Sequence, residues 1–320
     1  MALTAHLSSS WKTFILTCHL PSLVFLLYWR MLPESPRWLL SRSKILECEK
    51  ILIKISRING REFSERSKNL LMEAQKEEKK IPLKTIMTYF VLTKHLLLTS
   101  LILSIGYILY SGMVLNIHNM TGSKIVNYLI LALVEIPGNA IGSVSAQYFG
   151  RRLSSVAFSA LSAVCSVASI FVLKDPFVLA ILCVLNKMFS GALVLIVYMQ
   201  IGELFPTLMR ATAYGLTGIV SLAALIFIPP LIAMGSSNAL LPYYILFGIG
   251  LLGIVLCSFL PETIGRPIPQ TINEAVLIGT NQTYLSFIHK WNGHKYLNDQ
   301  YYKENIDHIA VVSLDPFNNK

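Results

Sequence analysis

The chain has 320 residues, of which 54% are hydrophobic and only 14% are charged, and its formal net charge is +10. Because a soluble domain carries about 25% charged residues, this composition excludes an ordinary soluble protein and indicates an integral membrane protein. The basic excess is then typical of cytosolic loops beside a bilayer, and we expect no nucleic-acid partner. The five cysteines show no CxxC or CxxH spacing, so neither a disulfide framework nor a metal site is predicted.

Seven apolar runs are long enough to cross a bilayer, because about 20 apolar residues span a hydrocarbon core of roughly 30 Å. Only backbone that is hydrogen-bonded within its own segment is stable in lipid, so these runs predict helices. They cover residues 13–32, 95–117, 124–146, 153–173, 177–200, 211–234 and 240–260. The fold class is therefore an all-α, multi-pass membrane bundle. The opening stretch MALTAHLSSSWK lacks the basic region and cleavage site of a signal peptide, and we expect none.

The longest link between runs covers residues 33–94 and is basic, with 14 Lys and Arg residues against 8 Glu. This excess predicts a cytosolic loop, an outer N-terminus and an inner C-terminus. Within the loop, ILECEKILIKISRI (residues 45–58) has apolar residues at helical spacing, so we expect a short amphipathic helix on the membrane surface. SERSKNLLMEAQKEEKK (residues 64–80) predicts a second, solvated helix.

Two sequons fall on opposite sides of this predicted topology. Asn119 heads the glycosylation sequence Asn-Met-Thr in an outer link, close to the bilayer, and is a candidate for glycosylation. Asn281 heads a second sequon in the cytosolic tail, where we expect no modification.

A nearly repeated phrase closes two of the apolar runs. LPESPRWLL (residues 32–40) follows the first run, and LPETIGRP (residues 260–267) follows the last. A duplicated six-helix unit produces such a repeat. We therefore expect residues 1–32 to be the last helix of an otherwise missing N-terminal half, with five helices upstream. Residues 33–94 are then a cytosolic helical loop, residues 95–260 a six-helix C-terminal half, and residues 261–320 a cytosolic tail.

Five motifs in order resemble one family over roughly residues 11–276. They are PESPRWLLSRSKILECEKILIKISRING, ALVEIPGNAIG, FGRR, GELFPTLMRATAYG and LPETIGRPIPQTINEA. The family they resemble is the organic cation/anion/zwitterion transporter family of the major facilitator superfamily. The resemblance implies a fold of twelve spans in two halves that rock about a central site. This chain is similar only to the sixth helix and the second half, so about seven spans are expected and the fold is incomplete relative to twelve.

Charged residues at the predicted cytosolic helix ends form one group of candidates. Arginine there can pair with carboxylates and with helix C-termini, and the resemblance implies a network that latches the two halves. The alternative is that these residues merely satisfy the positive-inside rule. Gln147 and Tyr148 stand where the family usually has Asp-Arg, which removes one carboxylate partner. The latch candidates are Glu34, Arg37, Gly150, Arg151, Arg152, Glu203, Arg210, Glu262 and Arg266.

Polar residues inside the runs form the second group, because intramembrane charge is costly and usually functional. Glu135 precedes Pro137 in a kinked run and is either a cation or proton site or a structural hydrogen-bond partner; Lys187 either lines the cavity or reaches the outer interface. Leu222 occupies the position where the family commonly carries a charged residue, so the sign of the substrate charge stays open. The substrate-binding candidates are Tyr107, Tyr110, Glu135, Lys187, Tyr198 and Gln200.

Together these features predict a plasma-membrane carrier of small organic ions that works by alternating access, without a cofactor or metal ion. The main alternative is a truncated or regulatory membrane subunit, with a complementary N-terminal half or a full-length relative as its partner. A seven-helix receptor is disfavoured, because Asp-Arg-Tyr and Asn-Pro-x-x-Tyr do not occur at the third and seventh runs. An enzyme is disfavoured because HExxH, GxSxG and P-loop motifs are absent from the sequence.

Overall fold

The computed structural model describes residues 10–25, 32–41, 44–60, 89–114, 124–266 and 272–279, with isolated positions at 4, 8, 28, 63–65, 67–69, 71–72 and 268–269. Every regular element of these residues is a helix. The chain divides into two compact units. The first consists mainly of Leu3–Pro82 and Asn292–Lys320, and the second of Leu83–Trp291.

The first unit begins with α2 (Trp11–His19), which continues into the 3-10 helix η1 (Leu20–Val24). A capping box starts α2: the Ser10 hydroxyl accepts the Thr13 N–H, and the Thr13 hydroxyl accepts the Ser10 N–H. Pro21 lacks an N–H, which agrees with the change of helix type at this point. Residues 26–27 and 29–31 of the predicted first span lie outside the described residues, so a membrane crossing at 13–32 stays a prediction.

Two further helices of the first unit, α4 (Pro36–Ser41) and α5 (Ile45–Ile58), pack against each other. Leu39 and Cys48 are almost fully buried, and the Cys48 thiol donates to the Pro36 carbonyl at 3.3 Å. α5 covers the stretch predicted as an amphipathic helix, and that helix is confirmed. Its position at the membrane surface stays a prediction, and most of the second predicted helix at 64–80 lies outside the described residues.

The second unit contains six helical spans of membrane length and apolarity among the described residues. Each matches one of the last six predicted runs. They are α8 (Phe90–Val114), α9 (Lys124–Leu133) with α10 (Glu135–Tyr148), α11 (Arg151–Phe171), α12 (Pro176–Leu204), α13 (Thr207–Ala224) with η3 (Leu225–Phe227) and α14 (Ile228–Ser237), and α15 (Leu241–Ser258). A short helix, α16 (Ile272–Leu277), follows them.

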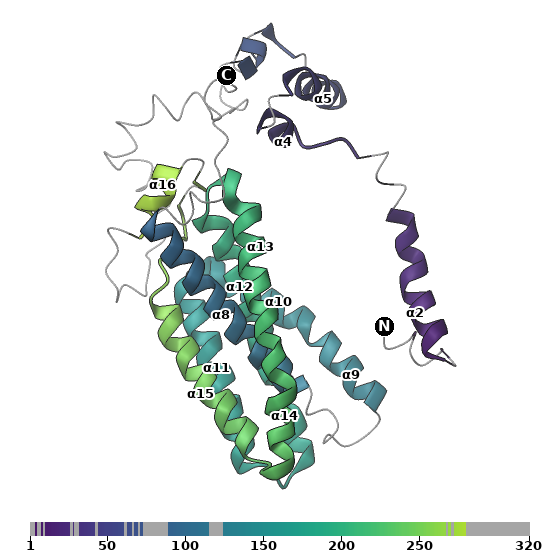
Figure 1. Ribbon diagram of the computed structural model, residues 1–320, viewed down its shortest axis with the longest axis vertical. Coiled ribbons are helices and arrows are strands. Elements are labelled where there is room, and N and C mark those ends of the chain that lie inside the picture. Colours follow the sequence, from purple (N-terminus) through teal and green to yellow (C-terminus); the bar gives the residue numbers. More distant parts are fainter. Residues whose placement is uncertain are drawn as a thin grey trace. The chain divides into compact units, whose positions relative to one another are not determined.

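The spans of the second unit form one bundle, from which α9 diverges (Figure 1). α8 packs against α12, α13 and α15, while α12 also contacts α10 and α11. Small residues bring the helices close, which is how van der Waals packing stabilises membrane bundles. A Cβ at Gly142 would lie 3.0 Å from the Cβ of Ala192, and one at Gly250 would lie 2.8 Å from that of Ala163. Both glycines therefore hold neighbouring backbones at contact distance.

Polar side chains add hydrogen bonds between these helices. The Ser162 hydroxyl of α11 donates to the Asn186 side chain of α12, whose Nδ2 donates to the Leu109 carbonyl of α8 at 3.1 Å. The Ser159 hydroxyl of α11 donates to the Gly250 carbonyl of α15 at 3.0 Å. Each such bond in a membrane is worth about 0.6 kcal/mol on average, so the network fixes helix register more than it adds stability.

Two of the six spans are interrupted, and prolines explain both breaks. Pro137 offers no N–H to Leu133, the last residue of α9, and a turn at Val134 separates α9 from α10. Pro229 and Pro230 likewise offer no N–H for α-helical bonds to the carbonyls of Leu225 and Ile226, and the 3-10 helix η3, in which the Ile228 N–H donates to the Leu225 carbonyl, interrupts the span there. The first break places Glu135 at the start of a new helix.

Candidate functional site

Three side chains from three spans meet inside the second unit, and we call them the central cluster (Tyr110, Glu135 and Lys187). Oε1 of Glu135 lies 2.9 Å from the Lys187 ammonium. The same oxygen accepts a hydrogen bond from the Tyr110 hydroxyl. The ammonium also lies 4.9 Å from the centroid of the Tyr110 ring, within cation–π range. Each member therefore contacts the other two.

Local sequence places each member of the central cluster. The Pro137 break makes Glu135 the first residue of α10, where the helix dipole favours a carboxylate. Gly191 lies one turn after Lys187 on α12, and a Cβ there would lie 3.9 Å from the Tyr110 ring. The ring of Tyr110 therefore packs against α12 at Gly191, beside the Lys187 ammonium.

The two charges of the central cluster differ in exposure. The Lys187 side chain is 8% exposed, whereas that of Glu135 is 39% exposed. A buried ammonium needs a counter-ion because isolated charge inside a membrane protein is costly. The carboxylate that supplies this counter-charge remains open on one side. The helices of the second unit therefore cover Glu135 only in part.

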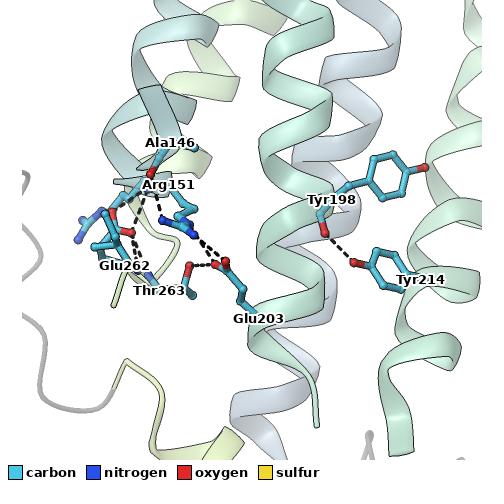
Figure 2. Close-up of polar contacts among 9 residues, drawn as sticks. Ala146, Arg151, Tyr198, Glu203, Tyr214, Glu262 and Thr263 are labelled. Carbon is cyan, nitrogen blue, oxygen red and sulfur yellow. Dashed lines mark hydrogen bonds and ion pairs between the residues drawn. The ribbon is translucent and has the colours of Figure 1, made fainter. Parts of the chain in front are cut away.

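Three tyrosines form a second polar group in the bundle. The hydroxyls of Tyr107 on α8 and Tyr198 on α12 lie 3.0 Å apart. The Tyr214 hydroxyl of α13 donates to the Tyr198 carbonyl at 2.9 Å, as Figure 2 shows, and the two rings stack with centroids 6.0 Å apart. Tyr107 and Tyr198 were predicted from the sequence as substrate-binding candidates, whereas Tyr214 was not predicted. The sequence feature that could have indicated Tyr214 is its position in the motif GELFPTLMRATAYG, four residues after Arg210.

Gln200 is fully buried on α12. Neither atom of its side-chain amide has a hydrogen-bond partner among the described residues. No hydrogen bond therefore joins Gln200 to the tyrosines or to the central cluster, and its role in substrate binding stays a prediction.

A third polar group lies where α11 begins, α12 ends and the chain leaves α15, and we call it the end cluster (Arg151, Glu203, Glu262 and Thr263; Figure 2). The Arg151 guanidinium donates to both oxygens of Glu203, from Nε at 3.2 Å and from Nη2 at 2.9 Å. Its Nη1 donates to the Ala146 carbonyl at 3.1 Å. The Thr263 hydroxyl donates to Glu203 at 2.5 Å. Glu203 thus supplies a carboxylate to Arg151 although Gln147 and Tyr148 cannot.

Glu262 joins the end cluster through backbone groups. Its carboxylate accepts the N–H groups of Arg151 and Arg152, each at 3.0 Å, at the N-terminus of α11. It also accepts those of Thr263 at 2.9 Å and Ile264 at 3.0 Å. A carboxylate at a helix N-terminus satisfies unpaired donors and complements the dipole. The glutamate of the phrase LPET therefore caps another helix 110 residues away in sequence.

Gly150 makes this cap possible. Its φ of +97° is a conformation that side-chain-bearing residues rarely adopt, and a Cβ there would lie 2.5 Å from Oε2 of Glu262. Glycine therefore meets two demands at one position, the backbone turn into α11 and the space for the carboxylate.

The remaining latch candidates are arranged differently. Arg152 is buried and donates to the Ser258 carbonyl at the end of α15, and Arg210 donates to the Phe205 carbonyl at the end of α12 at 3.5 Å. The backbone N–H of Arg266 donates to the Thr263 carbonyl at 3.3 Å. Glu34 is exposed in the first unit; the side chain of Arg37 and all of Asn119 lie outside what the structure describes. Their predicted roles stay predictions.

Comparison with known families decides what kind of protein carries these clusters. Residues 1–274 match the family model described as "Sugar (and other) transporter". The chain belongs to this family. Similar relatives are "Organic cation transporter 1" from Caenorhabditis elegans (29% identical over 278 residues) and "Solute carrier family 22 member 13" from Homo sapiens (30% identical over 272 residues). "Organic cation/carnitine transporter 2" from Homo sapiens is 27% identical over 285 residues. The predicted resemblance to organic ion transporters is thereby confirmed.

The alignments cover most of this chain but only part of the other proteins. The three relatives match over 84%, 84% and 87% of this chain but over only 48%, 49% and 51% of their own lengths. The chain spans about half the length of these curated relatives. Its fold is similar to that of a major facilitator superfamily proton:xylose symporter, with a TM-score of 0.59 at 19% identity, over 82% of this chain and 59% of the symporter chain. The predicted fold class is therefore confirmed.

Proposed function

We propose that the protein carries small organic ions across the plasma membrane and that the central cluster is the substrate-binding wall of this chain. Its family consists of membrane transporters, and the relatives named above include organic cation and carnitine transporters. The observation that carries the proposal is the partly exposed Glu135 carboxylate held by a buried ammonium and a tyrosine hydroxyl inside the bundle. Groups of this kind inside a membrane protein mark ion and substrate pathways.

The chemistry of the cluster suits an organic ion. Glu135 offers a carboxylate for a cationic group, and Lys187 offers an ammonium for an anionic one. The Tyr110 ring adds a face that attracts an ammonium group, as it already does for Lys187. A bound ion competes for charges that are already paired, so binding exchanges one partner for another instead of stranding a charge in the membrane.

The end cluster supports alternating access as the transport mechanism. It ties the start of α11 and the end of α12 to the chain after α15 through one guanidinium, two carboxylates and a threonine. Such a network can hold these three helix ends together in one state and release them in another, because its bonds are short and oriented. We propose that it moves as one body with the helix ends that it joins.

A complementary six-helix half is the partner that this proposal requires. Only 22% of the span Val126–Tyr148 and 22% of the span Met209–Gly235 is buried, against 56% of Phe90–Gly112. A carrier that alternates access uses two halves that face one site. The second candidate function, a regulatory subunit without transport of its own, is supported by the same open spans and by the match to half of each relative.

Uptake measurements test the proposal directly. The full chain is reconstituted in liposomes, alone and with the N-terminal half of a relative, and uptake of labelled organic cations, anions and zwitterions is followed. We expect uptake by the paired halves that Glu135→Gln abolishes and that Glu274→Gln, a matched change on α16 outside the spans, leaves unchanged. Uptake that survives Glu135→Gln would overturn the assigned site. Absence of uptake under both conditions, with the chain bound to a relative, would favour the regulatory function.

A further inference from the structure

Helix α5 in the first unit has two faces with different surroundings. One face packs on α4 and contains the buried Cys48 together with half-buried isoleucines. The opposite face carries Lys50, Lys54 and Arg57, all exposed. Their spacing of four and three residues aligns the three cations along one side of the helix. The apolar face is occupied by α4, so the exposed face is a basic one.

The acidic residues of α5 do not neutralise this row. Glu47 pairs with Lys44 at 3.2 Å, and Glu49 pairs with Lys68 at 3.2 Å. The hydrogen bond and the charge of Glu49 raise the pKa of Lys68. Among the described residues, no carboxylate pairs with Lys50, Lys54 or Arg57. We call these three residues the basic row.

Apolar side chains stand at both ends of the basic row. Leu46 is 74% exposed and Ile58 is 75% exposed, and each lies within one turn of a cation of the row. Three aligned cations with a large apolar side chain at each end match the boundary of a bilayer, where headgroup charge lies beside hydrocarbon. Neither residue packs into the first unit, so both can enter that boundary.

We propose that the basic row docks α5 on acidic phospholipid headgroups at the membrane surface, with Leu46 and Ile58 dipping into the headgroup layer. The occupant is a bilayer because this chain is an integral membrane protein, and only residues 59–89 separate α5 from α8, the first described span. Attraction to an anionic leaflet amounts to about 1 kcal/mol per Lys or Arg close to the surface. The inference is independent of the substrate and of the central cluster.

Hydrogen exchange of the full chain in lipid nanodiscs tests this docking. Exchange of α5 peptides is compared in discs of phosphatidylcholine alone and in discs that also contain phosphatidylserine. Docking is expected to slow exchange only in the anionic discs. The slowing should vanish at about 1 M salt, where the screening length falls to about 3 Å. Peptides from α11, deep in the bundle, serve as the internal reference.

Two matched variants separate charge from folding. The triple variant Lys50→Gln, Lys54→Gln, Arg57→Gln is expected to lower the docking equilibrium on the order of a hundredfold, from about fivefold per cation. The charge-conserving variant Lys50→Arg, Lys54→Arg, Arg57→Lys should dock like the natural chain. Equal exchange in neutral and anionic discs would overturn the proposal. So would protection that persists in the Gln variant or at high salt, which would point to a protein contact.

Discussion

The central cluster and the end cluster both hold Glu residues against basic side chains, yet they differ in how completely their carboxylates are used. In the end cluster, Glu262 accepts four backbone N–H groups and Glu203 accepts a two-pronged guanidinium and a hydroxyl. In the central cluster, Glu135 contacts Lys187 and Tyr110 through a single oxygen and stays partly exposed. This difference is why we propose that the end cluster holds helices in place and that the central cluster exchanges partners.

The largest effect should come from the tightest point of the end cluster. Gly150→Ala forces a side chain into a positive-φ position and into contact with Glu262. We expect a loss of about 3 kcal/mol from backbone strain and the disturbed cap, measured as a lower thermal unfolding midpoint in detergent. Gly215→Ala on α13 is the control, because a Cβ there meets nothing within 4 Å. An equal unfolding midpoint for Gly150→Ala and Gly215→Ala would contradict a structural role for the end cluster.

A smaller loss is expected from the cap itself. Glu262→Gln turns one accepting oxygen into an NH2 group that faces backbone donors and removes the charge from the α11 N-terminus. The expected cost is about 2 kcal/mol. Glu274→Gln provides the matched control. If the Glu262→Gln variant has the same thermal unfolding midpoint as the natural chain, the carboxylate is not what holds α11 to the chain after α15.

The central cluster should respond differently, with a large change in transport and a modest change in stability. Glu135→Gln leaves the buried Lys187 ammonium without its counter-ion, and we expect a loss of about 1–2 kcal/mol, reduced because Glu135 is partly solvated. The double variant Glu135→Gln, Lys187→Met should regain most of that stability without regaining uptake. A double variant that transports normally would show that the ion pair is only structural.

The smallest effect should come from the tyrosines between the two clusters. Tyr107→Phe removes one hydroxyl of the Tyr107–Tyr198 contact. One such bond contributes about 0.6 kcal/mol to the stability of a membrane protein, so the thermal unfolding midpoint should fall by only about 1–2 °C. Tyr148→Phe, at an exposed position of α10, is the control. A rise in KM for a transported test ion with an unchanged midpoint would instead assign this pair to substrate binding.

The sequence predicts the elements of this fold well, for identifiable reasons. Runs of apolar residues set the six described spans, and the spacing of isoleucines in 45–58 sets α5. Glu135 stands out because a carboxylate is rare in such a run. These signals are local, since each depends on neighbouring residues in one helix.

The contacts between elements could not be predicted from the same sequence. Lys187 could equally have reached the interface, and its pairing with Glu135 depends on the register between α10 and α12, which the Gly138 and Gly142 contacts set. The partners of Glu262 are backbone N–H groups, which every residue except proline carries and which leave no sequence signature. Thr263 was missed for a related reason, because a threonine after Pro-Glu has no pattern that points to Glu203.

The break near Pro137 divides the second described span into two halves, α9 and α10, that pack differently. Gly138 and Gly142 press α10 against α12, so the half that follows Glu135 is clamped. The half that precedes it, α9, is joined through the turn at Val134 and is largely exposed. A ligand bound at the proposed Glu135 site would therefore act at the turn between α10, which packs closely on α12, and the largely exposed α9. We expect any bending that accompanies substrate binding to occur at the turn at Val134, with α10 staying in place.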